Sequence, residues 1–236
     1  MARKVLLCGE GPTDCGKQKF GSTEWEEGPV QPIIMKLVNG DIEFAYTTKE
    51  EVKGKKIQRR TGAKVTGHGA KSYKLCMIAE ERKDIDNIIC YVDADREHGS
   101  RKSKRESKKR LQEIYSQISN GFQQFSAARS HNSIPMVPLK MIESWLLADD
   151  QAFAQCFESS PANPVLPGQP ELIWGDENNP SSNHPKNYLK RVLEQYNQEA
   201  NRDTFKSIAE EIDIDALRER CPLSFEIFYQ DIKAIC

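Results

Sequence analysis

Short apolar runs alternate with stretches of helical periodicity through residues 1–150. Four runs have the length and composition of buried or half-buried strands: 4–9 (KVLLCG), 41–48 (DIEFAYTT), 86–92 (DNIICYV) and 133–139 (SIPMVPL). Apolar residues recur at helical spacing between and after them, at 31–38, 72–82, 103–118 and from Ile142 onward. This order predicts an α/β fold, with a mostly parallel, Rossmann-like sheet flanked by helices.

The pattern changes after residue 150. Residues 158–185 are rich in Ser, Pro, Asn and Gly, which is typical of a linker or a lid-like excursion. Four short amphipathic helices are predicted after it, at 185–199, 204–211, 213–220 and 223–235. We therefore expect a first domain at residues 1–150, and a linker with a C-terminal helical extension at residues 151–236.

Composition narrows the class of protein. The 236 residues are enough for a substantial apolar core, and no apolar run reaches the length of a membrane span or a signal peptide. The 7 cysteines are scattered and form neither a CxxC pair nor a zinc-binding spacing. We expect a soluble cytoplasmic protein that is neither secreted nor membrane-bound.

Basic residues gather in two places although the net charge is only -1. The first cluster comprises Lys53, Lys55, Lys56, Arg59, Arg60, Lys64, Lys71 and Lys74. The second comprises Arg101, Lys102, Lys104, Arg105, Lys108, Lys109 and Arg110. Such clusters are typical of a surface that binds the phosphates of nucleic acid, and an exposed helix face with a mobile loop explains each cluster equally well.

Acidic residues follow several of the predicted strands. Glu10 follows the first strand with Asp14 four residues later, Asp93 and Asp95 end the run at 86–92, and Glu143 follows the run at 133–139. The carboxyl ends of parallel strands meet at one sheet edge, where ligands of α/β folds bind. Carboxylates brought together there repel one another, and a divalent metal relieves the repulsion. An oxygen-only set favours Mg²⁺, with Mn²⁺ as the alternative ion.

Each of these acids also has a purely structural explanation. The segment EGPTD at residues 10–14 contains good helix-capping residues, and a DxD such as Asp93–Asp95 is common in turns. Glu143 falls in the first turn of a predicted helix, where the helix dipole favours an acid. The metal interpretation rests on the combination of Glu10 with the DxD. Two ions roughly 3.5 to 4 Å apart could then activate a water and stabilise the leaving oxygen in phosphodiester cleavage.

Two strings carry a family resemblance. LLCGEGPTD at residues 6–14 and IICYVDAD at residues 88–95 resemble the Toprim domain of topoisomerases, bacterial primases and the overcoming-lysogenization-defect (OLD) nucleases. The resemblance implies that Glu10, Asp93 and Asp95 are catalytic and bind Mg²⁺. In the nuclease branch a second acid and a downstream Glu add to the metal site, and Asp14 and Glu143 resemble them.

Three further strings, PLKMIESWLLADD, HPKNYLKRVL and RCPLSFEIFYQDI, are similar to an uncharacterised prokaryotic Toprim-like family often encoded beside ATPases in defence-type loci. The chain has no Walker A motif, so an ATPase activity would have to come from a partner. It also has no recognisable topoisomerase tyrosine motif and no primase zinc-binding region.

These observations lead to three functional hypotheses. The first is a Mg²⁺-dependent Toprim-fold nuclease that cleaves DNA or RNA, as the effector of an anti-phage defence system with an ATPase partner. The second is a non-cleaving Toprim-like module that binds nucleic acid or regulates an ATPase. The third is a phosphotransfer or nucleotidyl-transfer enzyme using the same metals.

Overall fold

The computed structural model describes residues 2–57, 64–94, 104–125 and 131–234. Asp95 lies outside the described residues, as do the basic residues Arg59, Arg60, Arg101 and Lys102, and the side chain of Lys104 is not described.

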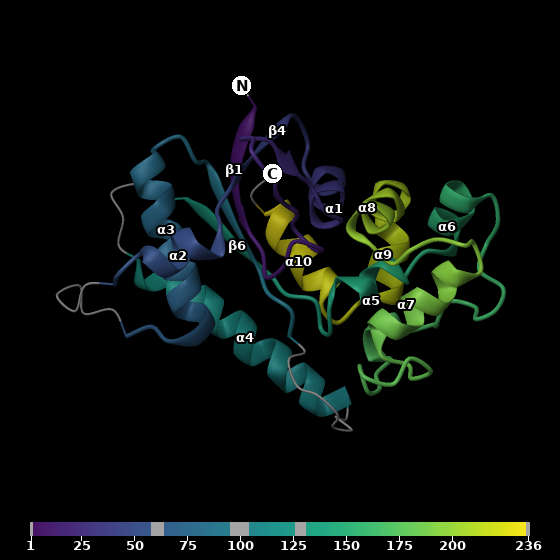
Figure 1. Cartoon of the computed structure of the whole chain (residues 1–236). Coiled ribbons are helices and arrows are strands. Elements are labelled where there is room, and N and C mark those ends of the chain that lie inside the picture. Colours follow the sequence, from purple (N-terminus) through teal and green to yellow (C-terminus); the bar gives the residue numbers. More distant parts are fainter. Residues whose placement is uncertain (1, 58–63, 95–103, 126–130, 235–236) are drawn as a thin grey trace.

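The centre of the molecule is a four-stranded parallel sheet (Figure 1). Its strands are β1 (Arg3–Cys8), β4 (Ile42–Tyr46), β5 (Asn87–Tyr91) and β6 (Asn132–Met136), in the order β4-β1-β5-β6. The predicted α/β class with a parallel sheet is confirmed. Starting from β1, the chain adds β4 on one side and then β5 and β6 on the other, so the topological switch point lies between β1 and β5. The ligand-binding crevice of such a fold is expected at the carboxyl ends of those two strands.

Helices cover both faces of the sheet (Figure 1). Residues of α3 (Gly67–Arg82) and α4 (Lys104–Gln124) pack with the sheet in one apolar cluster, which contains Leu75 and Ile114. Residues of α1 (Val30–Leu37) and of the C-terminal helices form a second cluster on the opposite face, around Ile34 and Phe228. The other helices are α2 (Lys49–Gly54), α5 (Ile142–Leu146), α6 (Asp150–Phe157), α7 (Pro185–Glu194), α8 (Arg202–Glu211), α9 (Ile214–Arg220) and α10 (Phe225–Lys233).

Most predicted elements are present, with several differences. The helix predicted from Ile142 is split into α5 and α6, because Asp149 caps a new helix by accepting a hydrogen bond from the Gln151 N–H at 2.9 Å. Helix α3 begins at Gly67, five residues before the helix predicted at 72–82, and α2 lies in a segment for which no helix was predicted. The connection after β1 contains a small hairpin of β2 (Lys17–Gln18) and β3 (Trp25–Glu26).

The C-terminal helices share the apolar cluster of the α1 face. Trp145 of α5 is fully buried, donates a hydrogen bond to Ser224 Oγ at 3.0 Å and meets Phe225 edge-on. The segment expected to be a linker contains a short 3₁₀ helix (Pro170–Leu172), whose buried Glu171 accepts backbone hydrogen bonds from Leu223 and Ser224. The boundary at residue 150 stays a prediction.

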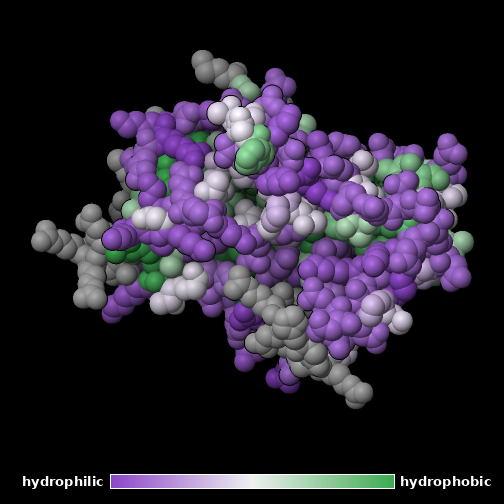
Figure 2. All heavy atoms as spheres, in the orientation of Figure 1, coloured by the Kyte–Doolittle hydropathy of each residue, from purple (hydrophilic) through white to green (hydrophobic). Residues whose placement is uncertain are grey.

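The surface of the face seen in Figure 2 is mainly hydrophilic, and its hydrophobic residues form small separate groups. None of the described helices combines the length and apolar character needed to cross a lipid bilayer.

Candidate functional site

The loop that follows β1 folds back on itself and places Asp14 at the carboxyl edge of the sheet. A Cβ atom at Gly9 would lie 2.3 Å from Cys15 Sγ, and one at Gly28 would lie 2.2 Å from the Asp14 carbonyl oxygen. Both contacts are far too short, so glycine is required at each position. The buried Gln31 side chain holds the fold by donating to the Cys15 carbonyl at 2.8 Å and accepting from the Gly28 N–H at 3.1 Å.

Asp93 continues the line of β5 and lies on the α1 side of the sheet. The β5 pairing extends beyond the strand, because the Ala94 N–H donates to the Pro138 carbonyl at 3.1 Å. Two residues before Asp93, the buried Tyr91 ring belongs to the apolar cluster of the α1 face, and its hydroxyl donates a hydrogen bond to the Asp93 carboxylate. Tyr91 therefore fixes the direction in which Asp93 points.

Glu143 lies in the first turn of α5 and is only 3% exposed. Burial raises the pKa of Glu143 to about 7, and the negative charge of Asp14 adds to the shift. The helical position foreseen for Glu143 is confirmed. Its side chain nevertheless belongs to the same electrostatic environment as Asp14.

Asp14, Asp93 and Glu143 interact with one another although they come from three separate segments. Burial raises the pKa of Asp14 to about 6, partly offset by Lys186. Burial likewise raises the pKa of Asp93 well above its ordinary range, and the charges of Asp14, Glu143 and Glu10 increase the shift. Three ionised carboxylates at this place are unfavourable without a positive charge.

The side chains fit a hard divalent cation by their chemistry, although they do not form an assembled site. Within the described ranges, no group of three His, Cys, Asp or Glu residues is arranged to hold a metal ion. The predicted ligand Asp95 lies outside those ranges. The three acids offer only oxygen atoms, and their mutual repulsion is the condition that a bound Mg²⁺ would relieve. We refer to Asp14, Asp93 and Glu143 as the acidic side of the sheet edge.

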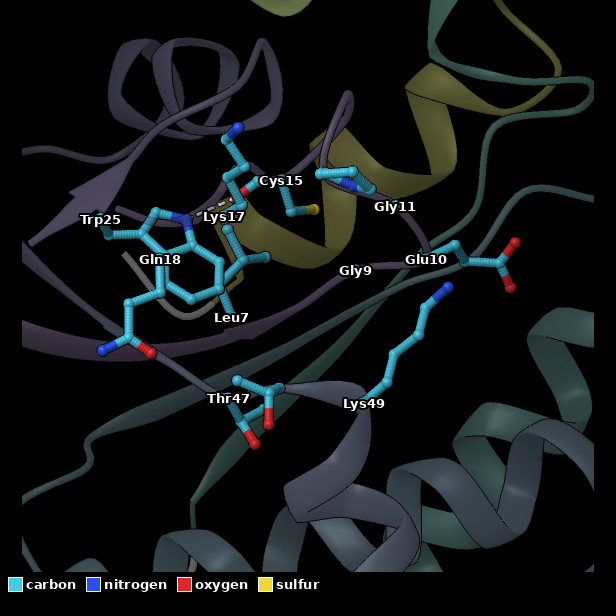
Figure 3. A pocket seen from close by; sticks show the side chains of 13 residues that line it. Leu7, Gly9, Glu10, Gly11, Cys15, Lys17, Gln18, Trp25, Thr47 and Lys49 are labelled. Carbon is cyan, nitrogen blue, oxygen red and sulfur yellow. Dashed lines mark hydrogen bonds between the residues drawn. The ribbon is translucent and has the colours of Figure 1, made fainter. Parts of the chain in front are cut away.

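Glu10 lies near a different set of side chains. It lines a hollow of about 270 Å³ together with Cys8, Gly9, Lys49, Val52, Lys53 and Lys71. Lys49 and Lys53 form no ion pair with any described residue, and Figure 3 shows Lys49 extending toward Glu10. We refer to Glu10 and the three lysines as the basic side of the sheet edge.

Lys71 of α3 lies directly at the switch point of the sheet. Its ammonium group donates to the Tyr91 carbonyl at 3.0 Å and to the Gly9 carbonyl at 3.3 Å, and thereby joins the ends of β5 and β1. Lys71 thus lines the hollow with Glu10 and contacts the last residue of β5, two residues before Asp93. The basic side and the acidic side are therefore adjacent at Lys71, between the ends of β1 and β5.

The match to a known family covers most of the chain. The model of a domain of unknown function, DUF4276, matches residues 29–233. The chain belongs to the DUF4276 family. Neither the curated proteins nor the solved structures contain a match to it.

The DUF4276 match includes Lys71, Asp93 and Glu143, and begins after Glu10 and Asp14. On the acidic side of this DUF4276 chain, Asp93 and Glu143 therefore lie inside the matched range and Asp14 lies before it.

Lys186 is a site residue that the sequence did not reveal. It lies in the first turn of α7 and donates to Glu177 at 2.9 Å. Burial works to lower the pKa of Lys186, but Glu177 and the charges of Glu143 and Asp14 outweigh it, so the pKa is raised. In the string HPKNYLKRVL it stands beside Lys190 and Arg191, and nothing distinguishes it from them. Glu177 is nine residues away, but Glu143 and Asp14 come from distant segments.

The predicted basic clusters are distributed over several surroundings. Lys53 and Lys71 line the hollow, whereas Lys55 forms an ion pair with Glu81. Lys108 and Lys109 are exposed on α4, whose first turns project beyond the body of the molecule (Figure 1). Lys49, outside both clusters in the sequence, joins the first cluster in space.

Proposed function

We propose that this chain is a Mg²⁺-dependent nuclease that cleaves phosphodiester bonds of DNA or RNA. The observation that carries the proposal is the approach of Asp14, Asp93 and Glu143 at the carboxyl edge of the sheet, next to a hollow lined by Lys49, Lys53 and Lys71. A site that cleaves phosphodiesters requires carboxylates that bind a metal ion and cations that bind the phosphates, and both are present at this sheet edge.

Each side chain has a role in this proposal. Oxygen atoms of Asp14, Asp93 and Glu143 hold the ion, together with the predicted ligand Asp95. The bound Mg²⁺ supplies charge neutralisation and a more acidic water. Glu10 faces the bound phosphate and moves a proton to or from the reacting oxygen, while the lysines hold the phosphates.

The family resemblances add a biological setting to the proposal. In the motifs quoted above, Glu10, Asp14, Asp93, Asp95 and Glu143 resemble acids of the OLD-type Toprim nucleases. The similarity to a Toprim-like family found beside ATPases extends the proposal to the effector of an anti-phage defence system, activated by an ATPase partner in the cytoplasm.

The test is a cleavage assay with a panel of tRNA, single-stranded DNA and duplex DNA. Wild type is compared with Asp93→Asn in Mg²⁺, in Mn²⁺ and in EDTA, with and without the product of a neighbouring ATPase gene. We expect cleavage that needs the metal and Asp93. Glu43→Gln, an exposed carboxylate near the opposite end of β4, is the matched control. Cleavage that survives both EDTA and Asp93→Asn contradicts the proposal.

A second candidate is a non-cleaving module that binds nucleic acid or regulates an ATPase. The observation that favours it is that no metal-binding group is assembled within the described residues. It predicts that nucleic acid or ATPase binding is unchanged in Asp93→Asn and that no member of the panel is cut under any condition. Binding that is lost together with cleavage in Asp93→Asn counts against it.

A further inference from the structure

A second hollow adjoins the basic side and contains an aromatic ring. It has a volume of about 220 Å³ and is lined by residues of the β1 loop, the β2–β3 hairpin and the start of α2. Gly9, Glu10 and Lys49 line both hollows, so the two share a wall. In Figure 3, Trp25 and Gln18 lie on one side of this hollow, and Glu10 and Lys49 on the other.

The Trp25 ring is held rigidly. Its indole N–H donates to the Cys15 carbonyl at 2.8 Å, and the ring stacks on Tyr46 with centroids 4.3 Å apart and planes 3° from parallel. Tyr46 does not line the hollow, whereas Trp25 does. The indole is therefore a fixed flat wall, backed by Tyr46 and open to a ligand on the side of the hollow. A ring fixed before binding loses little entropy when a second ring stacks on it.

The polar groups around the indole suit the edge of a nucleobase. Gln18, Thr47 and Thr48 lie at the rim of the same hollow. The Gln18 amide already donates to the Ser22 carbonyl and the Thr47 hydroxyl to Glu51, so each offers a ligand an acceptor oxygen. The Thr48 hydroxyl accepts from the Glu51 N–H and keeps its own proton to donate. Amide and hydroxyl groups can each donate or accept hydrogen bonds, which matches the mixed donors and acceptors of a base. The neighbouring hollow offers Lys49, Lys53 and Lys71 for the phosphate attached to that base.

We propose that the Trp25 hollow binds one unpaired base of a single-stranded nucleic acid, with the adjoining phosphate held by Lys49, Lys53 and Lys71. A paired base is stacked inside the duplex and cannot enter a concave site, whereas a base of a single strand can stack on an aromatic ring. The base site stands on its own geometry. The statement that the strand is a substrate rests on the proposed nuclease function.

The experiment measures binding by fluorescence anisotropy, in an Asp93→Asn background so that no strand is cut. The probes are a labelled single-stranded oligo-thymidylate, the same strand in a duplex, and a strand of equal length without bases. We expect the single strand to bind at least about tenfold more tightly than the duplex. Trp25→Leu should weaken single-strand binding about tenfold and leave the abasic strand unaffected, as expected for the loss of one stacked base. Trp25→Phe should restore most of the affinity.

Trp174→Leu is the matched control, because Trp174 is also partly exposed but lies outside the hollow. A second measurement covers the case in which Trp25→Leu does not fold. In a Trp174→Phe chain the remaining tryptophans are Trp25 and the buried Trp145, so oligo-thymidylate should quench the fluorescence of Trp25. Equal affinity for single strand and duplex, or folded Trp25→Leu with unchanged binding, overturns the inference. Absence of quenching overturns it as well.

The two proposals fail separately. If cleavage requires the metal, is unchanged in Trp25→Leu and is faster on duplex, the nuclease proposal is supported and the base site is wrong. If single strands bind in a Trp25-dependent way and the wild-type chain cleaves no substrate, the base site is supported and the nuclease proposal is wrong.

Discussion

The acidic side and the basic side lie at the same sheet edge but differ in their surroundings. On the acidic side, burial raises the pKa of Asp14, Asp93 and Glu143, the charge of Asp14 adds to the shifts of Asp93 and Glu143, and Lys186 opposes the shift of Asp14. On the basic side, Glu10 shares a hollow with three lysines. The charge of Glu10 reaches Asp14 and Asp93, but the neighbouring side chains differ: carboxylates dominate the acidic side, and lysines dominate the hollow that Glu10 lines.

Strand register explains the division. Cys8 of β1 is the partner of Cys90 of β5, and both side chains pack in the α3–α4 cluster. Tyr91 packs in the opposite cluster, on the α1 face, and Asp93 follows it by strand alternation, whereas Glu10 lines a hollow with Cys8 and Lys71. The sequence spacing thus brings Glu10 and Asp93 to neighbouring strand ends without giving their side chains the same neighbours.

The largest effect is expected on the cleavage reaction, where variants of Asp14 and Glu10 distinguish a metal ligand from a proton-transfer group. If the acidic side holds the ion, Asp14→Asn should raise the Mg²⁺ concentration needed for half-maximal cleavage by at least about tenfold. Glu10→Gln should lower the rate at saturating Mg²⁺ by about a hundredfold or more, with little change in the Mg²⁺ requirement. Cleavage rates across a Mg²⁺ titration measure both. If Glu10→Gln also shifts the Mg²⁺ requirement, the two sides act as one metal site and the distinction is wrong.

The next effect concerns the stability of the metal-free protein. The pKa of Glu143 lies at about 7, above its ordinary value of 4.5. In the unfolded chain this carboxyl loses its proton near pH 4.5, whereas in the folded protein it keeps the proton up to about pH 7. The free energy of unfolding therefore falls as the pH rises from about 4.5 to about 7. In EDTA, Glu143→Gln should stabilise the fold by about 2 to 3 kcal/mol at pH 8 and hardly at pH 5.

Urea unfolding at the two pH values measures this difference. Glu219→Gln removes one exposed carboxylate from α9 and controls for the change in net charge. Saturating Mg²⁺ should reduce the advantage of Glu143→Gln at pH 8, since the ion stabilises the ionised wild type. An equal gain at both pH values would show that the benefit comes from packing and not from charge.

A smaller effect on the free energy of unfolding is expected for Lys71, which lies between the basic and acidic sides. Lys71→Met keeps the apolar stem but leaves the Gly9 and Tyr91 carbonyls without this donor, which should cost about 1 to 3 kcal/mol of unfolding free energy. Lys74→Met on the same helix is the control, because the Lys74 side chain makes no hydrogen bond or ion pair with a described residue. Equal stability of the two variants in urea would mean that Lys71 does not join the strand ends.

The parts of the site that follow from local pattern could be predicted from the sequence. Apolar runs that stop at Gly9 and before Asp93 placed Glu10 and Asp93 at strand ends. The run that contains Pro135 forms the edge strand β6, where a proline is tolerated. Strand register and the return of the C-terminal helices are tertiary properties. The separation of Glu10 from Asp93, and the approach of Lys186 to Glu143, could therefore not be predicted.

The smallest effect tests whether the basic side binds phosphates. Each of Lys49→Ala and Lys53→Ala should weaken nucleic-acid binding several-fold and lower the slope of log affinity against log salt by roughly 0.7 to 0.9, the value for one lost phosphate contact. Lys190→Ala removes an exposed lysine of α7 away from the hollow and should leave the slope unchanged. Anisotropy titrations at several salt concentrations measure the slopes. If all three variants change the slope equally, binding is spread over the surface, and the basic side is no more than a local excess of charge.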